Sequence, residues 1–288
     1  MKIPSLLSDG RVHISCEIFP PKEFSGLDQA VKVASDIATL KPSFISVTYG
    51  AGGNTAAHTL EIARAVKERG VTPLYHLTCA TATMEQIKER LDELDAAGIE
   101  NVLALRGDIP AGMDFPDPRH YRFASELVGQ IKSRGGFAIG AACYPEGHPE
   151  SPSKDHDLDF LRRKVDSGAD FLTTQMFFDN NILYNFLYRA LQKGIRVPVL
   201  PGIMPVVNAG QIKKITALSG ASLPPRFAAI LDRFSENPKA MRQAGIAFAT
   251  EQIIDLIANG VNNIHIYTMN RPQIAAAIFQ NLSDILRE

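Results

Sequence analysis

Short apolar segments recur along the chain, and each is followed by a longer stretch whose apolar residues return with helical spacing. Eight such segments lie at residues 13–19, 44–50, 73–79, 101–108, 138–145, 171–178, 197–205 and 263–270. Strands that alternate with helices indicate a parallel sheet, and eight of these units can close a barrel. We therefore predict an α/β fold, a single (β/α)₈ TIM barrel over residues 1–288, with its active site at the C-terminal ends of the strands.

The stretches between the strands carry their own helix signals. Thr83 with Gln86 three residues later predicts a capping box at the start of a helix, and Gly98 ends that helix. The helices expected in this way cover residues 27–40, 55–69, 84–97, 122–134, 155–167, 180–193, 208–218 and 271–285. The connection 206–262 is too long for one unit and predicts extra helices between strands seven and eight. A doubly wound open sheet is the alternative, but it would leave some strands unplaced.

Composition and charge narrow the class of protein. Thirty basic and thirty-one acidic residues give a formal net charge of −1, so we expect neither nucleic acid nor an anionic membrane as partner. The N-terminus has no sustained apolar region, and the longest uncharged stretch, 197–212, contains three prolines and two glycines. We expect a cytoplasmic protein.

Strand alternation assigns the cysteines to the packing face. Side chains at i and i+2 of a strand share a face, so Cys16, Cys79 and Cys143 should point outward, against the helices. The sequence has no CxxC pair, and no His or carboxylate stands at a short ligand spacing from His76. We predict no metal site.

Glu17 is the first candidate for chemistry, because alternation turns it into the barrel, opposite Cys16. Desolvation there would disfavour its charged form, which suits a general acid near neutral pH. A structural carboxylate paired with a basic neighbour is the alternative.

Arg106, Gly107 and Asp108 end the fourth strand. We expect Arg106 and Asp108 to share the functional face, with Leu105 on the opposite, packing face. The glycine would allow close backbone approach to a ligand, beside one positive charge and one acceptor. An Arg106–Asp108 ion pair that seals the rim is the alternative.

Other polar residues cluster at the same strand ends. His76 and Thr78 share the inward face of strand three, and Tyr144, Glu146 and His148 end strand five. Gln175 is expected to share a face with Thr173 and Phe177; its amide could recognise a heterocycle edge or bond a neighbouring strand end.

Loops 109–121 and 145–156 follow strands four and five and are long enough to be binding loops or lids. The glycine-rich segment 50–54 could expose backbone N–H groups or be a plain turn. Residues 162–164, Arg-Arg-Lys, could reach an anionic ligand or form a solvated face.

The order of these residues resembles the methylenetetrahydrofolate reductase family. The matching stretches are CEIFPPK (16–22), ISVTYGAGG (45–53), HLTC (76–79), ALRGDIP (104–110), AACYPEGHPE (141–150), RRKVDSGAD (162–170), TTQMFFD (173–179), PGIMPV (201–206) and YTMNR (267–271). The resemblance implies an FAD-binding barrel that reduces 5,10-methylenetetrahydrofolate to 5-methyltetrahydrofolate, as in one-carbon metabolism and methionine biosynthesis.

The resemblance also implies roles for residues. Glu17 would be the acid that opens the bridged folate to an iminium cation, and reduced flavin would be the hydride donor. Asp108 would lie near flavin and pterin and favour the cation. Flavin contacts are implied at Thr48, His76, Arg106, Gly107, Asp108, Ala124, Tyr144, His148, Asp157, Arg163 and Lys164. Substrate contacts are implied at Gln175, Gln211 and Arg271.

Three positions depart from the family pattern. Ile215 stands where NADH-using relatives place a stacking phenylalanine, so the electron donor could be NADH, NADPH or an electron-transferring partner subunit. Phe160 replaces an asparagine and Phe123 a tyrosine. We expect a homo-oligomer or a hetero-complex. A flavin-free pterin-binding transferase and a non-catalytic folate-binding subunit of a larger complex are the alternative functions.

Overall fold

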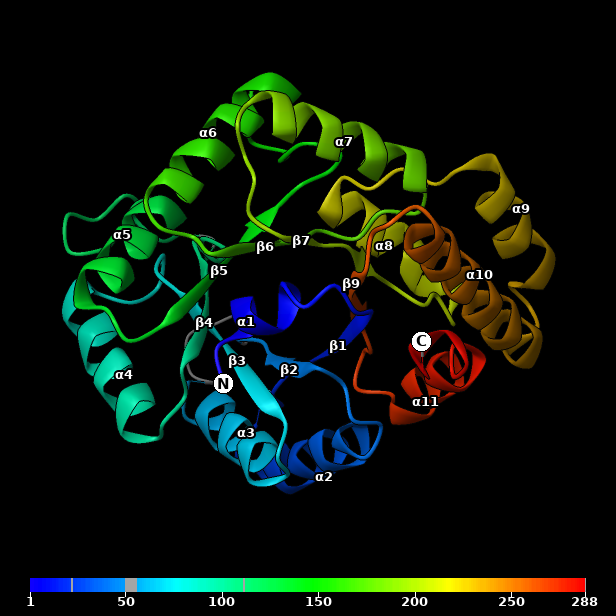
Figure 1. Ribbon diagram of the computed structural model, residues 1–288, viewed down its shortest axis with the longest axis horizontal. Coiled ribbons are helices and arrows are strands. Elements are labelled where there is room, and N and C mark those ends of the chain that lie inside the picture. The colour runs from blue at the N-terminus through cyan, green and yellow to red at the C-terminus, as the bar shows by residue number, and fades with distance from the viewer. Residues whose placement is uncertain (22, 50–55, 111, 288) are drawn as a thin grey trace.

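The computed structural model describes residues 1–21, 23–49, 56–110 and 112–287. For six of these positions it describes the backbone alone: Phe24, Gln211, Lys213, Lys214, Ala217 and Leu218. Figure 1 shows helices surrounding a central ring of strands. The glycine-rich segment 50–54, a candidate ligand-binding turn in the sequence, lies outside the described residues.

Within the described ranges, nine parallel strands form one sheet that nearly closes into a barrel. They are β1 His13–Ile18, β2 Phe44–Val47, β3 Thr72–Thr78, β4 Asn101–Leu105, β5 Ala138–Cys143, β6 Phe171–Thr174, β7 Val199–Leu200, β8 Gly202–Ile203 and β9 Asn263–Tyr267. The sheet order is β7-β6-β5-β4-β3-β2-β1-β9-β8. The predicted barrel is confirmed.

The seventh predicted strand is divided by Pro201 into β7 and β8. β7 pairs with β6 and β8 pairs with β9, so this one segment joins the two ends of the sheet. Proline has no N–H to give to a ladder. Its carbonyl oxygen still accepts from His265 N at 2.9 Å, and Gly202 N donates to Thr174 Oγ1 at 2.9 Å.

The helices follow the predicted order around the barrel. They are α2 Leu27–Ala38, α3 Ala56–Glu68, α4 Met84–Ala96, α5 Ala124–Arg134, α6 Lys154–Asp166, α7 Asn180–Gln192, α8 Ala209–Ser219, α9 Pro225–Phe234, α10 Pro238–Ala258 and α11 Pro272–Asn281. The Thr83–Gln86 capping box is present in both directions. Two helices, α9 and α10, follow α8 before β9, which confirms the extra helices.

A short helix that the sequence did not predict, α1 Ile3–Leu7, lies at the centre of the ring in Figure 1. Ile3 and Leu7 pack against Phe44, Leu74 and Leu103 inside the barrel. Ile3 N also donates to Asn101 Oδ1 at 2.8 Å. This helix therefore fills the barrel interior away from the C-terminal strand ends.

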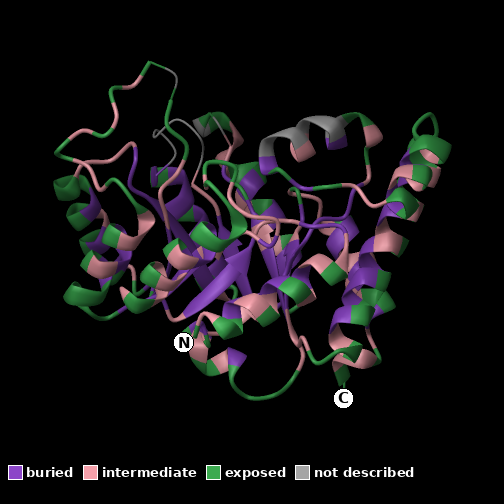
Figure 2. Cartoon of the chain, turned by 90° about the horizontal axis from the view of Figure 1, so that it is seen from above, coloured by how far each residue is buried: buried purple, intermediate pink, exposed green. Residues whose placement is uncertain are grey.

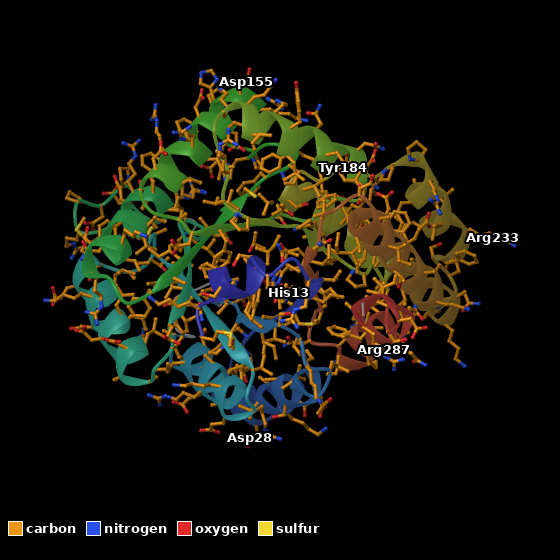
Figure 3. All side chains as sticks on the ribbon, in the orientation of Figure 1. His13, Asp28, Asp155, Tyr184, Arg233 and Arg287 are labelled. Carbon is orange, nitrogen blue, oxygen red and sulfur yellow. The ribbon has the colours of Figure 1, made fainter. Side chains whose placement is uncertain are left out.

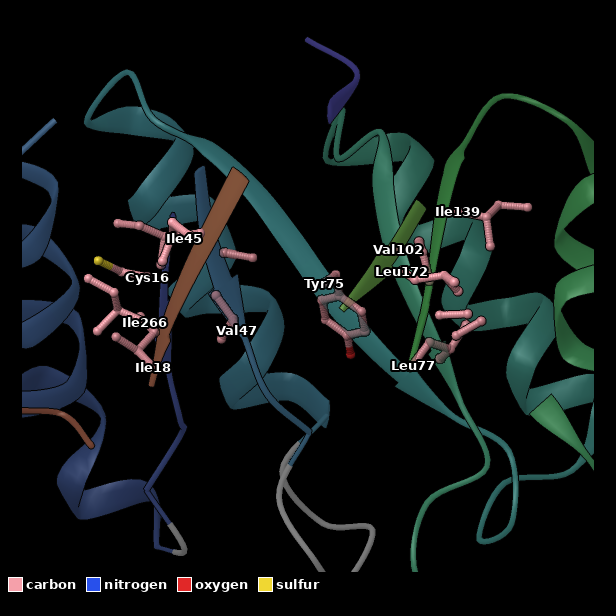
Figure 4. Close-up of a cluster of buried hydrophobic side chains, with 14 of the residues drawn as sticks. Cys16, Ile18, Ile45, Val47, Tyr75, Leu77, Val102, Ile139, Leu172 and Ile266 are labelled. Carbon is pink, nitrogen blue, oxygen red and sulfur yellow. The ribbon is translucent and has the colours of Figure 1, made fainter. Parts of the chain in front are cut away.

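The larger hydrophobic core lies between the strands and the helices, and Figure 4 shows part of it. Cys16, Cys79 and Cys143 are all buried in this layer, as alternation predicted. Figure 2 shows the buried residues concentrated in the strands and on the inner helix faces. Figure 3 labels Asp28 and Arg233 at the periphery and His13 near the barrel axis.

The assignment of Leu105 to the packing face is wrong. Leu105 packs with the small interior cluster that contains Leu103, because both residues point into the barrel. β4 ends at Leu105, so Arg106 and Asp108 belong to a turn, where strand alternation no longer fixes the direction of a side chain.

Candidate active site

A cavity of about 820 Å³ opens where β3, β4 and β5 end and where α5 and α6 begin. Residues from both predicted loops border it, among them Pro110 and His148. Nine of the predicted flavin-contacting positions line it: Arg106, Gly107, Asp108, Ala124, Tyr144, His148, Asp157, Arg163 and Lys164. Thr48 and His76 are not among its lining residues. The structure thus brings together residues from strand ends far apart in the sequence.

Gly107 shapes the floor of this cavity. Its φ is +81°, and an added Cβ would lie 3.0 Å from Thr78 Cβ. The backbone before it is held by Ala80 N, which donates to Arg106 O at 2.8 Å. Glycine is therefore required here by conformation and by the close approach of β3.

Arg106 forms a bidentate ion pair with Glu150, from the loop after β5. Arg106 Nη1 lies 2.6 Å from Glu150 Oε2, and Nη2 lies 2.7 Å from Oε1. The two side chains stabilise each other's charged form. The hydrogen bonds with Glu150 raise the pKa of Arg106, and the same bonds lower the pKa of Glu150. The Arg106–Asp108 ion pair offered as an alternative is wrong, because Asp108 is exposed and Arg106 is engaged with Glu150.

The basic run at 162–164 divides between two environments. Lys164 Nζ donates to Ala142 O at 2.7 Å, and burial lowers the pKa of Lys164. Arg163 is exposed, with its guanidinium carbon 5.5 Å from the centroid of Phe160. Both residues line the cavity, so two cationic side chains of α6 are available to an anionic ligand.

The remaining lining residues include polar and aromatic groups. Asp157, in the first turn of α6, is buried and accepts from Ser151 Oγ at 3.0 Å. Tyr144 and His148 pack edge to face with ring centroids 4.6 Å apart. Burial raises the pKa of Tyr144 to about 12 and lowers the pKa of His148, so both groups are neutral near pH 7. Phe123 and Phe160 lie exposed at the rim.

Glu17 stands in a second group of residues, inside the barrel. Its Oε2 lies 3.7 Å from Nε2 of His76 and 3.5 Å from Nε2 of His265. Both imidazoles are buried, and burial lowers the pKa of His76 to about 4. The side chain of Glu17 keeps 19% of its accessible surface. A carboxyl group flanked by two imidazoles and still reachable from outside is suited to proton transfer.

His265 was not singled out in the sequence. It shares the inward face of β9 with Tyr267, and the pairing of β9 with β1 brings it beside Ser15 and Glu17. The signal that could have found it is the i, i+2 spacing of His265 and Tyr267 in the last strand.

The three predicted substrate positions stand on different segments: Gln175 directly after β6, Gln211 in α8 and Arg271 at the N-cap of α11. Gln175 Oε1 accepts from Met176 N, the next residue in the chain, at 2.9 Å. Phe177 does not share its face, because β6 ends at Thr174 and Phe177 packs in the outer core. Arg271 is half-buried at the N-cap of α11. The side chain of Gln211 is outside the described ones.

Two further positions bear on ligands. Thr48 is half-buried beyond the end of β2, and its N–H donates to Ile18 O at 2.9 Å. Ile215 packs with a cluster around Phe178 and Phe227, under α8 and α9.

Over the described ranges, no group of three His, Cys, Asp or Glu side chains is placed to hold a metal ion. No described helix is both long and apolar enough to cross a membrane.

Comparison with known families decides the relationship. A sequence model described as "Methylenetetrahydrofolate reductase" matches residues 2–283. The chain belongs to the methylenetetrahydrofolate reductase family. This membership agrees with the resemblance found in the strand-end motifs.

Relatives of known name fall into two size classes. The 5,10-methylenetetrahydrofolate reductase of Escherichia coli (strain K12) is 36% identical over 275 residues, which cover 95% of this chain and 91% of the relative. Methylenetetrahydrofolate reductase (NADH) 1 of Zea mays is 37% identical over 295 residues, which cover 98% of this chain and 50% of the relative. This methylenetetrahydrofolate reductase homologue therefore spans about half the length of its plant relatives.

A solved structure shares the fold of this family member. An uncharacterized protein from Clostridium thermocellum, described as binding two copies of 5-methyl-5,6,7,8-tetrahydrofolic acid, superposes with a TM-score of 0.71 over 99% of each chain. The two sequences are 13% identical, so the likeness is one of fold.

Proposed function

We propose that this protein reduces 5,10-methylenetetrahydrofolate to 5-methyltetrahydrofolate with FAD as cofactor, and that NADH, NADPH or an electron-transferring partner supplies the electrons. Family membership over residues 2–283 supports the folate reaction. The observation that carries the proposal is the arrangement of two groups at the barrel: a large cavity with cationic and aromatic walls, and a carboxyl group between buried imidazoles.

The residues of the cavity fit a flavin dinucleotide. Arg106, Arg163 and Lys164 offer positive charge for a pyrophosphate, and Gly107 leaves the backbone open to close approach. Tyr144 and Phe160 offer aromatic faces for flat rings. Thr48 and His76 are proposed as further contacts, and Ala124 and Asp157 as neighbours at the starts of α5 and α6. A bound flavin would supply the two-electron hydride chemistry that side chains lack.

The chain's own contribution to the reaction is to hold and move a proton. Glu17, as a neutral acid, would give its proton to a nitrogen of the bridged folate and so promote opening of the ring. Asp108, exposed at the cavity, would place a negative charge where positive charge develops on the folate. Gln175, Gln211 and Arg271 are proposed as folate contacts, Arg271 for a carboxylate.

The experiment that tests this function compares Glu17→Gln with Glu85→Gln, a matched change at an exposed position on α4. Both variants should take up FAD. Glu17→Gln should lose folate reduction by about 100- to 10,000-fold, the usual contribution of a positioned acid, and Glu85→Gln should lose none.

Two results would overturn the proposal. One is a wild-type protein that takes up no FAD and leaves methylenetetrahydrofolate unchanged, as a flavin-free transferase or a binding subunit would. The other is a Glu17→Gln variant that reduces folate at the wild-type rate.

A further inference from the structure

The imidazole of His265, beside Glu17, is enclosed by its neighbours. His265 is 1% exposed. The ring of Phe44 stacks on it at a centroid distance of 5.9 Å, and Tyr267 meets it edge to face at 5.5 Å. The ring of His265 therefore cannot turn over without displacing a neighbouring aromatic side chain.

Ser15 fixes which nitrogen of this ring carries hydrogen. Ser15 Oγ lies 3.1 Å from Ile264 O and 2.7 Å from His265 Nδ1. A hydroxyl has one hydrogen, and a carbonyl oxygen can only accept. Both contacts are satisfied only if Ser15 donates to Ile264 O and His265 Nδ1–H donates to Ser15 Oγ.

The opposite nitrogen of His265 then faces Glu17 without a hydrogen. When the ring is neutral it carries one N–H, and in that form Nε2 presents a lone pair 3.5 Å from Glu17 Oε2. An ionised carboxylate and a bare nitrogen are both acceptors and repel each other. A neutral carboxylic acid can instead donate its O–H to Nε2, a contact that shortens readily when substrate orders the site.

The other neighbours of Glu17 do not reverse this preference for a neutral carboxyl group. His76 Nε2 is engaged with Ser46 Oγ at 2.5 Å, and the low pKa of His76, about 4, leaves that ring neutral. Tyr267 gives its hydroxyl hydrogen to Thr174 O at 2.5 Å. Each of these side chains is therefore occupied elsewhere, and the environment favours a Glu17 that brings its own hydrogen.

We propose that Ser15 and His265 act as a positioning pair that keeps Glu17 in its neutral, proton-donating form before the substrate reacts. This inference rests on the proposed function, because it explains how the proposed acid holds its proton. Neither Ser15 nor His265 needs to touch the substrate. They act by fixing which nitrogen of the His265 ring carries the hydrogen.

The first test reads the tautomer directly and uses neither folate nor turnover. The ¹⁵N chemical shifts of histidine rings separate protonated from bare nitrogens, and the His265 signal is assigned with His265→Gln. Wild-type protein should show Nδ1 protonated and Nε2 bare. Ser15→Ala should move His265 towards the Nε2–H tautomer, and Ser15→Thr, which keeps the hydroxyl, should restore the wild-type signal. A wild-type His265 with bare Nδ1, or a Ser15→Ala signal unchanged from wild type, overturns the proposal.

The second test measures the pH profile of the folate half-reaction. In Ser15→Ala the Nε2–H tautomer of His265 can donate to an ionised Glu17 and stabilise it. The loss of rate at high pH should therefore begin about one pH unit lower than in wild type. Above the midpoint of the wild-type profile, the variant should react about tenfold more slowly. Ser15→Thr should keep the wild-type profile, and FAD affinity should stay the same in all three proteins. A Ser15→Ala profile that matches wild type overturns the proposal. Absence of folate reduction in wild type would instead refute the proposed function, and the tautomer measurement would still decide this inference.

Discussion

Arg106 and Glu150 lie 44 positions apart in the sequence, yet two guanidinium nitrogens of Arg106 meet the two carboxylate oxygens of Glu150 at 2.6 and 2.7 Å. The pair joins the turn after β4 to the loop after β5, at the edge of the cavity. Arg106 is thus held in place by a partner that keeps 61% of its own surface exposed. A phosphate-bearing ligand would compete with Glu150 for the same donors.

We predict opposite effects for the two members of this pair. Arg106→Gln should weaken FAD binding about tenfold or more, because a charge-assisted hydrogen bond contributes about 1.5–3 kcal/mol. Glu150→Gln should bind FAD at least as tightly as wild type, and it should change the free energy of unfolding by less than about 1 kcal/mol, since the pair is partly exposed. Flavin fluorescence during titration of the apoprotein measures the affinity. Wild-type affinity in Arg106→Gln would contradict this role.

Gly107→Ala should destabilise the protein by about 1–3 kcal/mol, because its φ of +81° is strained for any other residue. The new Cβ would also press on Thr78. Gly129→Ala, in the middle of α5 with open space around its added Cβ, is the control and should stabilise by about 0.5–1 kcal/mol. Urea unfolding measures both. Equal effects in the two variants would show that the turn at Gly107 imposes no conformational demand.

His76 should make stability depend on pH between its folded and unfolded pKa values. Burial lowers the pKa of His76 from 6.5 to about 4, so between these values the unfolded chain binds more protons than the folded one. Stability is then full above pH 6.5 and falls by up to about 3 kcal/mol as the pH drops towards 4. Denaturant unfolding of wild type and His76→Gln at several pH values tests this. The variant should lose less stability over this range, and an identical loss would exclude His76 as the cause.

The three cysteines should resist modification in the folded protein. All are buried, and burial raises the pKa of the Cys16 and Cys79 thiols to about 12 and the pKa of Cys143 higher still. Thiolate is the reactive form, so a thiol reagent should label none of them in native buffer and all three in denaturant. Rapid labelling of any cysteine in the native protein would contradict the outward packing.

The sequence predicted the parts of the fold that depend on local periodicity. Alternation within strands placed Cys16 in the outer core and turned Glu17 inward, and both assignments hold because these residues lie within β1. The same rule failed at Leu105 and Phe177, where the strand had ended or was about to end. Beyond the last ladder hydrogen bond, the turn geometry decides where a side chain points.

Partnerships across the closed barrel could not be read from one strand at a time. His265 reaches Ser15 from 250 positions away because β9 pairs with β1 in a particular register. Glu150 was likewise not recognised, since its role follows from the path of an irregular loop. The division of the seventh strand at Pro201 leaves its first part paired with β6 and its second part paired with β9.

The proposed function requires that this cavity hold a flavin that exchanges electrons with a folate. The most direct measurement mixes the FAD-loaded protein under anaerobic conditions with 5-methyltetrahydrofolate, NADH and NADPH separately, and follows the visible absorbance of the flavin. Methyltetrahydrofolate alone should bleach the flavin in wild type and much more slowly in Glu17→Gln. Bleaching by NADH or NADPH would identify the donor. A protein that binds FAD but whose flavin stays oxidised with methyltetrahydrofolate would contradict the proposed function.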